Sequence, residues 1–475
     1  MTRSFEAPEW IELRGYQQDA VQAWFDANGQ GIFNMATGTG KTITSLLAID
    51  ALQSNVTDSF ALIIAVPYQH LVDQWAEEVK QFGTSPVLAY ESRRNWQERF
   101  EGELAEFRVD ARDLPVVVTT HTTFASDPFQ RMIGRIKDSP TVLIADEMHH
   151  FGATHLSRGL PNHVDFRLGL SATPERFYDD EGTELLLRYF GDIVYEYGLQ
   201  EAIENGALCE YYYVPHIVEL TPEEAEDYDR ISKEIARLAG GMDGRLGDAD
   251  VQENETLKFK LFERARLVGT AENKLVRLVD LLKSERDIHH TLVYCGDGSV
   301  ENEISGRAKR HVDAAVDRLR TRLGIRTERF TADESRAERQ RLLAKFDAGE
   351  IQALVAIRCL DEGVDVPATQ TAYMLSSSSN PRQFVQRRGR ILRNHPGKQY
   401  AVIHDFIMMP PPDMGLSEDE GDAFSIERRL VEKELDRVNL FAEAARNHPS
   451  ADIDGLPTEG DALQRLKREY NLLDK

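Results

Sequence analysis

The sequence has few cysteines, no long hydrophobic run and a deficit of positive charge. Its three cysteines, Cys209, Cys295 and Cys359, lie far apart and lack the paired spacing of a zinc site or a disulfide framework. We therefore expect ordinary core thiols. The longest apolar stretch, residues 60–66, is far shorter than the roughly 20 residues of a membrane span, and the first ten residues carry no signal-peptide core. These absences predict a cytoplasmic protein with no membrane partner.

Basic residues are the scarcer charged class, with 56 lysines and arginines against 80 aspartates and glutamates and a formal net charge of −24. The acidic residues are spread along the whole chain, which is typical of proteins from a high-salt cytoplasm and equally compatible with an ordinary acidic protein. A nucleic-acid contact needs a basic surface, so any such track must be local. The 475 residues suffice for about three domains of ordinary size.

A glycine-rich turn near the N-terminus is the stretch around which the chain is organised. Residues 35–42 read MATGTGKT, follow a short apolar strand at 31–33 and open a helix at 43–52. Glycines let the backbone N–H groups wrap an anion at the helix N-terminus. Lys41 would reach the β and γ phosphates of ATP, and the Thr42 hydroxyl would ligate Mg²⁺. A turn without a ligand is disfavoured by the strand, the helix and the Lys-Thr pair together.

Buried strands that alternate with helices predict a parallel sheet in the first part of the chain, with strands at 60–66, 115–120, 141–145 and 166–170. Asp146 and Glu147 directly follow one of these strands, where such a sheet places ligand chemistry. Asp146 would hold Mg²⁺, and Glu147 would orient and deprotonate the attacking water. Upstream of the turn, the Gln17 amide matches the edge of adenine, which both donates and accepts.

A helical insertion is predicted over residues 221–270. It begins with an N-cap threonine, a first-turn proline and the capping-box residue Glu224. A second α/β set follows, with strands at 291–295, 353–357 and 371–375. Residues 383–393 read QFVQRRGRILR, and three-residue spacing on a helix would point Arg390 and Arg393 the same way. Beyond a linker at 410–424 we expect two more helices, one ending near Phe441 and one at 461–473.

Taken in order, these stretches resemble the superfamily 2 helicases and translocases. LRGYQ at 13–17 resembles the adenine-reading motif, MATGTGKT the Walker A loop, DEMH at 146–149 a DExH-type Walker B motif, SAT at 171–173 the element that couples hydrolysis to nucleic-acid binding, and QRRGRILR at 386–393 the arginine-finger motif. The details are most similar to the XPB and restriction-subunit branch, whose members act on DNA.

The resemblance implies an α/β fold of two RecA-like parallel-sheet domains in tandem, with a helical insertion and a helical C-terminal appendage. The expected boundaries are 1–206, 207–410 with the insertion at 221–270, and 411–475. The catalytic residues implied are Glu147, Gln386, Arg390 and Arg393. The ATP-binding residues implied are Arg14, Gln17, Ala36, Thr37, Gly38, Thr39, Gly40, Lys41, Thr42, Gly363 and Asp365. Thr42 and Asp146 are the expected Mg²⁺ ligands, and His149, Ser171 and Thr173 the expected coupling residues.

The sequence departs from the family pattern at three points. The first motif begins at Leu13, so we expect no XPB-type damage-recognition domain before it; no clear Arg-Glu-Asp triplet follows SATPER; and Ile357 stands where many relatives carry a nucleic-acid-contacting threonine.

The predicted function is an ATP-dependent DNA helicase or double-strand translocase in repair or defence. An RNA helicase shares the ATP machinery, and the motor subunit of a restriction complex would rely on a nuclease partner. The intact Glu147 and arginine motif argue against a third alternative, an ATP-gated scaffold.

Overall fold

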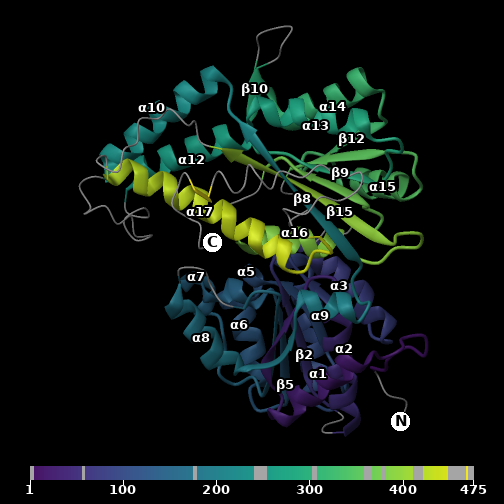
Figure 1. Ribbon diagram of the computed structural model, residues 1–475. Helices are drawn as coiled ribbons and strands as arrows, with labels where there is room; N and C mark the ends of the chain where they lie inside the picture. Colours follow the sequence, from purple (N-terminus) through teal and green to yellow (C-terminus); the bar gives the residue numbers. More distant parts are fainter. Residues whose placement is uncertain are drawn as a thin grey trace. The chain divides into compact units, whose positions relative to one another are not determined.

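The computed structural model describes residues 5–55, 59–174, 179–239, 254–301, 308–357, 366–376, 381–409, 421–447 and 467–468. The chain divides into two compact units, Met1–Ala207 and Leu208–Lys475. Each is an α/β unit built on a parallel sheet (Figure 1), which confirms the predicted fold class. The helix predicted at 461–473 lies outside the described residues, apart from two helical positions at 467–468.

The first unit contains a seven-stranded sheet in the order β3-β4-β2-β5-β6-β1-β7, with every described pair parallel. Its strands are β1 (Gln30–Met35), β2 (Ala61–Val66), β3 (Val87–Ala89), β4 (Val116–Thr120), β5 (Thr141–Asp146), β6 (Phe166–Ser171) and β7 (Ile193–Tyr197). The order places the carboxyl ends of β5, β6 and β1 side by side. These ends carry the acidic pair, the SAT stretch and the glycine-rich turn.

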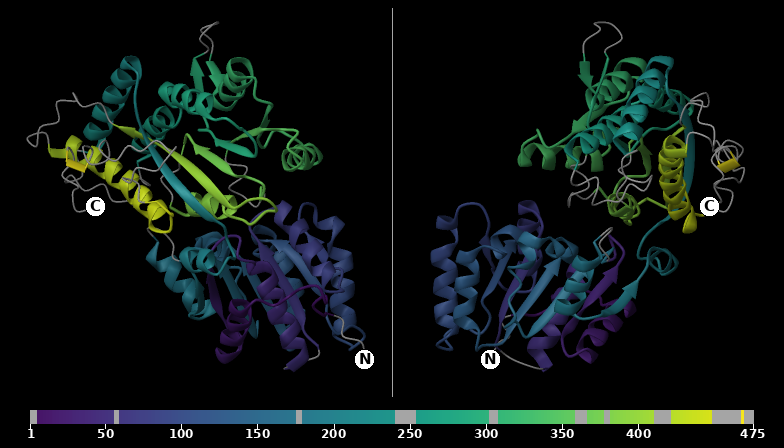
Figure 2. Two further views of the ribbon diagram at one scale, coloured as in Figure 1. Left: turned by 45° about the vertical axis from the view of Figure 1, so that its right-hand side comes forward. Right: turned by 90° about the vertical axis from the view of Figure 1, so that its left-hand side faces the viewer.

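Helices cover both faces of this sheet, as the side view in Figure 2 shows. They are α1 (Gly15–Asp26), α2 (Lys41–Asn55), α3 (Gln69–Gln81), α4 (Gln97–Phe107), α5 (His121–Phe124), α6 (Asp127–Ile133), α7 (Thr154–Ser157), α8 (Asp180–Phe190) and α9 (Leu199–Glu204), with 3-10 turns η1 (Arg93–Asn95), η2 (Gly134–Ile136) and η3 (Met148–Gly152). Successive residues of β2 point to opposite faces, yet Leu62, Ile63 and Ile64 are all at most 1% exposed. The continuous apolar run therefore reflects a strand covered on both sides.

The second unit contains a six-stranded parallel sheet in the order β12-β13-β9-β14-β15-β8. Its strands are β8 (Glu210–Glu219), β9 (Thr291–Tyr294), β12 (Thr327–Phe330), β13 (Ala353–Ala356), β14 (Thr371–Met374) and β15 (Tyr400–Met409), beside a separate antiparallel pair, β10 (Ser299–Glu301) and β11 (Ala308–Arg310). Its helices are α10 (Pro222–Ala239), α12 (Glu255–Gly269), α13 (Glu272–Ser284), α14 (His311–Leu323), α15 (Arg336–Asp347), α16 (Pro381–Ile391) and α17 (Gly421–Glu443).

The helical insertion forms as the sequence predicts, as the paired helices α10 and α12. The Glu224 N–H donates to the Thr221 hydroxyl at 3.3 Å, and the Glu224 carboxylate accepts from the Thr221 N–H at 3.0 Å, which confirms the capping box. The apolar stripe of α10 is buried, with Tyr228 and Ile235 at 0% exposure, and packs against Leu257 of α12. The insertion therefore has a small core of its own.

The described residues can be examined for cysteine pairing, clustered metal ligands and membrane-spanning helices. Cys209 and Cys295 are buried free thiols, as expected, whereas Cys359 lies outside the described part of the chain. Within the described ranges, no cluster of three or more His, Cys, Asp or Glu side chains could hold a metal ion. No described helix is long and apolar enough to cross a membrane.

Candidate nucleotide site

The glycine-rich turn connects the end of β1 to the first residue of α2, Lys41. Gly38 and Gly40 have φ angles of 92° and 84°, in the left-handed region that side chains disfavour. A Cβ on Gly40 would lie 3.2 Å from the Gln17 amide nitrogen. The Thr39 hydroxyl donates to the Ala36 carbonyl at 2.7 Å, which closes the turn. The backbone thus takes the shape that presents N–H groups and a helix N-terminus to an anion.

Lys41 folds back over this turn. Its ammonium donates to the Met35 carbonyl at 2.9 Å and to the Ala36 carbonyl at 3.4 Å. The Thr37 hydroxyl oxygen is buried in the same turn and has no hydrogen-bond partner within the described part of the chain. A cation above the turn and an unsatisfied hydroxyl inside it suit a loop shaped for a phosphate that is supplied from outside the protein.

Arg14, Tyr16 and Gln17 anchor the start of α1 against the turn. Gln17 is 5% exposed; its amide oxygen accepts from the Arg14 N–H at 3.1 Å, and its amide nitrogen donates to the Thr44 hydroxyl at 3.2 Å. An amide carries two donors and two acceptor lone pairs, so Gln17 retains the capacity to pair with an adenine edge. Tyr16, which sequence reasoning missed, donates to the Thr39 carbonyl at 2.7 Å and stacks on Tyr197 at 4.1 Å.

The acidic pair lies at the end of β5. One Asp146 carboxylate oxygen accepts from the Trp75 indole N–H at 2.9 Å and the other from the Glu147 N–H at 3.0 Å. Burial raises the pKa of Asp146, while the Trp75 hydrogen bond and the nearby Lys41 ammonium act to lower it. The two hydrogen bonds hold the Asp146 carboxylate in one orientation. Asp146 and Thr42 supply the hard oxygen donors that Mg²⁺ prefers, so the residues fit the predicted ion.

Glu147 adopts a strained backbone conformation. Its φ of 46° and ψ of 51° are left-handed, and for a residue with a side chain this conformation costs roughly 1 to 2 kcal/mol. Strain of this kind gathers at functional sites, where the surrounding structure enforces it. It sets the direction in which the predicted base leaves the strand.

The three predicted coupling residues lie in one line of contacts with Glu147. The Glu147 carboxylate is 3.4 Å from the His149 ring nitrogen Nδ1, which is itself 3.3 Å from the Ser171 hydroxyl. The Thr173 N–H donates to that hydroxyl at 3.1 Å. His149 and Ser171 are 5% and 0% exposed. The structure therefore connects the end of β5 to the end of β6 through polar side chains.

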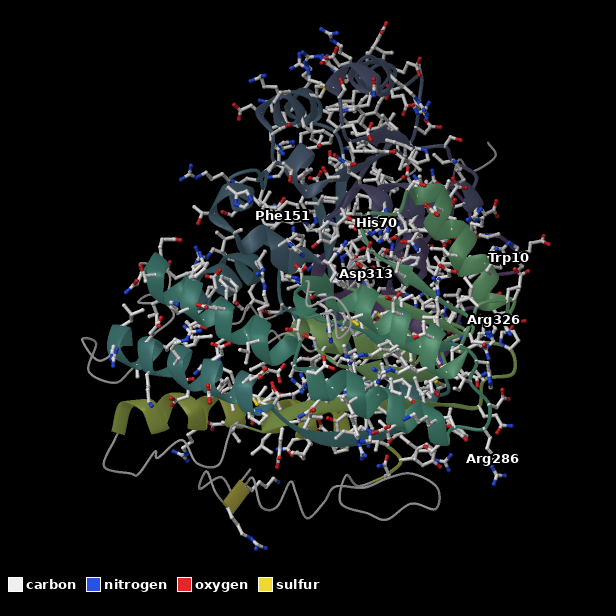
Figure 3. All side chains as sticks on the ribbon, turned by 90° about the horizontal axis from the view of Figure 1, so that it is seen from above. Trp10, His70, Phe151, Arg286, Asp313 and Arg326 are labelled. Atoms are coloured by element: carbon white, nitrogen blue, oxygen red, sulfur yellow. The ribbon has the colours of Figure 1, made fainter. Side chains whose placement is uncertain are left out.

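Rings that sequence reasoning missed lie just after the ends of β2 and β4. Tyr68 and His70 stack at 5.8 Å after β2, and His121, directly after β4, lies 4.2 Å from Phe151. Figure 3 labels His70 and Phe151. Burial lowers the pKa of His121 to about 3, so its ring stays neutral. A sequence signal existed, because His121 directly follows β4 just as Glu147 directly follows β5.

The arginine motif lies in the second unit, and one expectation about it was wrong. Helix α16 ends at Ile391, so Arg390 is on the helix but Arg393 follows it, in an antiparallel bridge with Leu208. Helical spacing therefore does not set the direction of Arg393; the bridge does. Burial lowers the pKa of Arg393 to about 10. Gln386, four residues before Arg390, shares its face of α16.

Two further predictions concern the second sheet. Gly363 and Asp365 lie outside the described residues. Ile357, just after β13, is 8% exposed and packs into the core of the second unit. Its side chain is therefore a core residue, in keeping with the departure from the family's threonine.

Two family models match the chain. The model described as type III restriction enzyme, res subunit, matches residues 10–176, and the model described as helicase conserved C-terminal domain matches residues 273–395. The first match contains the glycine-rich turn, the acidic pair and Ser171. The second contains α16.

Two curated relatives align with most of this chain. The DNA 3'-5' translocase XPB2 of Sulfurisphaera tokodaii is 27% identical over 419 residues, which cover 86% of this chain and 84% of the relative. The putative ATP-dependent helicase IRC3 of Saccharomyces cerevisiae is 26% identical over 423 residues, covering 85% of this chain and 52% of that one. The chain thus spans about half the length of the second relative.

A solved structure shares the fold. The ATP-dependent type ISP restriction-modification enzyme LlaBIII, bound to DNA, matches with a TM-score of 0.58 at 17% identity, covering 98% of this chain and 32% of that chain. The likeness extends over both units described above, and at this identity it concerns the fold alone.

Proposed function

We propose that this chain, which belongs to superfamily 2 of the helicases and translocases, is an ATP-driven motor that moves along DNA. The observation that carries the proposal is the line of contacts from Glu147 through His149 to Ser171 and Thr173. Hydrolysis would need the carboxylate together with the phosphate-binding turn, and a motor would also need that carboxylate coupled to a second strand end. The His149 ring and the Ser171 hydroxyl provide the link.

The site residues of the first unit would each have a distinct task in hydrolysis. The turn N–H groups and Lys41 would bind the phosphates, and Arg14 and Gln17 would hold the adenine side. Mg²⁺, when bound, would neutralise phosphate charge, with Thr42 and Asp146 as the residues that hold it. Glu147 would take the proton of the attacking water. Its neighbour His149, whose ring nitrogen lies 3.4 Å from the carboxylate, would report the state of that carboxylate to Ser171.

The second unit would supply positive charge to the reaction. Arg390 and Arg393 would stabilise the charge on the γ-phosphate in the transition state, and Gln386 would assist them. The lowered pKa of Arg393 supports this role, because a cation in a poorly solvated position gains more from an arriving anion than an exposed one does. Gly363 and Asp365 complete the proposed set from the family resemblance.

DNA is the proposed polymer because the names of the related proteins refer to DNA. XPB2 is named a DNA translocase, and LlaBIII was solved bound to DNA. Neither name concerns RNA. With a net charge of −24, the chain would make few and local phosphate contacts. A protein that uses ATP to move on DNA would work inside the cell, in agreement with the cytoplasmic location expected from the sequence.

An ATPase assay with three polymers tests the proposal. Duplex DNA, single-stranded DNA and RNA of equal length are compared at one salt concentration, with Lys41→Ala protein as the blank for contaminating ATPases. We expect hydrolysis to rise most with duplex DNA. Stimulation by RNA alone would contradict the DNA assignment and indicate an RNA helicase instead.

A second candidate is the motor subunit of a restriction or defence complex. The match of residues 10–176 to a restriction-subunit model favours it. A partner would then supply the nuclease. The same assay separates the two candidates, because a motor that needs its partner would show no stimulation by any polymer alone.

A further inference from the structure

Helix α17 packs against α16, the helix that carries most of the arginine motif. Figure 1 shows α17, in yellow, running along β8, and its last turns contact α16. The Arg388 guanidinium donates to the Leu440 carbonyl at 2.6 Å, and its carbon lies 5.1 Å from the centroid of the Phe441 ring. The Phe384 ring lies 5.8 Å from that of Phe441. The family motif does not account for these contacts.

Arg388 acts as a cap on α17. Leu440 is among the last four residues of that helix, whose carbonyls lack partners within the helix. A cation at a helix C-terminus is stabilised by these carbonyls and by the helix dipole. Arg388 is 5% exposed and Phe441 0% exposed, so the contact is shielded from water. Shielded, charge-assisted bonds permit little rotation of one helix against the other.

We call the contacts of Arg388 with Leu440 and Phe441 the junction. The end of α17 at this junction also contacts the sheet. The Tyr211 hydroxyl of β8 donates to the Phe441 carbonyl, and the Tyr213 ring stacks on the Phe441 ring at 5.2 Å. One turn earlier, Arg437 of α17 pairs with Asp405 of β15 at 2.9 Å, with both side chains almost fully buried. The end of α17 is therefore held to two strands of the sheet as well as to α16.

Arg388, which makes the junction, and Arg390 occupy opposite faces of one short helix, α16. At 100° per residue, Arg388 lies about 200° around the helix axis from Arg390. Because both residues lie on α16, a rotation of this helix that broke the Arg388 contact would rotate Arg390 about the same axis by the same angle.

We propose that Arg388 and Phe441 are positioning residues that hold α16 so that Arg390 meets the γ-phosphate, with α17 as their support. This inference rests on the proposed function, because it requires that Arg390 act in hydrolysis. A displacement near 1 Å of a group that acts in the transition state can lower the rate by up to about 100-fold. The loss would fall on kcat and spare ATP binding by the first unit.

The test compares Phe441→Ala with Val431→Ala. Val431 lies ten residues earlier on α17 and is 1% exposed, so its truncation weakens the packing of the same helix away from α16. We measure kcat, KM, the thermal midpoint, and binding of ADP with aluminium fluoride, a mimic of the transition state. Phe441→Leu is a milder replacement in case Phe441→Ala fails to fold.

We expect the Phe441 variants to lower kcat and to weaken binding of the ADP–aluminium fluoride probe by a common factor of roughly ten, while the stoichiometry of bound nucleotide and the affinity for ATP stay unchanged. Val431→Ala should lower the thermal midpoint without these losses. A mere loss of folded protein would instead lower the stoichiometry. Arg388→Lys keeps a donor for the Leu440 carbonyl and should recover most of what Arg388→Met loses.

Two results would overturn the inference in distinguishable ways. If Arg390→Ala lowers kcat but the Phe441 variants behave like Val431→Ala, the junction is structural only and the proposed function stands. If Arg390→Ala itself leaves kcat unchanged, there is nothing for the junction to position, and the arginine role in the proposed function fails as well.

Discussion

Replacement of Glu147 by glutamine is the most direct test of the chemistry, because the substitution changes one property and preserves the rest. Glutamine has the same length and the same cost at a φ of 46°, so the backbone at the end of β5 should not move. Asp146 keeps its bonds from Trp75 and from the N–H of residue 147. What is lost is the ability to take a proton from water.

The expected magnitude follows from that loss. A positioned general base contributes about 10²- to 10⁴-fold to a rate, or roughly 3 to 5 kcal/mol of barrier. Steady-state hydrolysis should fall by that factor, while ATP affinity stays close to wild type because the turn and Lys41 are intact. ATP should remain bound long enough to trap the protein on DNA, so DNA affinity measured with ATP should rise.

The matched control is Glu103→Gln in the same unit. Glu103 is a buried carboxylate on α4, with Arg99 at 3.1 Å and Arg112 at 3.4 Å. Its replacement should lower the thermal midpoint and leave kcat unchanged. Near wild-type turnover by purified Glu147→Gln protein would show that another group activates the water, and the assignment of the base would be wrong.

Three further outcomes are expected. Ser171→Ala removes the hydroxyl between His149 and Thr173, so it should reduce the stimulation of hydrolysis by DNA more than the basal rate; an intact stimulation ratio would show that coupling does not use this contact. Burial lowers the pKa of His311 from 6.5 to about 3, so on acidification the unfolded chain takes up the proton before the folded protein does. The contribution of His311 to the free energy of unfolding is therefore fully present above pH 6.5 and is lost as the pH falls toward 3. At pH 5 the loss is about 2 kcal/mol. Since the His311 ring accepts from the Gly296 N–H, His311→Asn should keep that bond and flatten chemical-denaturation stability over this range, whereas an unchanged slope would contradict the lowered pKa. If the net charge of −24 reflects adaptation to salt, the thermal midpoint should rise between dilute buffer and molar KCl, and a flat or falling midpoint would leave an ordinary acidic protein.

The sequence alone determined the elements whose signals are local. The glycine-rich turn, the buried runs of β2 and β5, the acidic pair at the end of β5 and the capping box of α10 each depend on residues within a few positions of one another. Local spacing was enough there because a strand end, a turn and a helix start follow from short-range backbone preferences. The parallel sheet could be predicted for the same reason, from the alternation of apolar runs with helices.

Only the tertiary structure decided which distant side chains meet. The contact between His149 and Ser171 depends on β5 and β6 being neighbours, and hydrophobic patterns do not specify strand order. The junction of Arg388 with Phe441 joins residues 53 positions apart, through a helix that the sequence predicted without showing which element it contacts. The end of α16 before Arg393 was decided by a bridge to Leu208, which lies on a remote segment. Side-chain chemistry is encoded residue by residue, but the geometry that turns it into a site comes from packing between segments that the sequence does not place side by side.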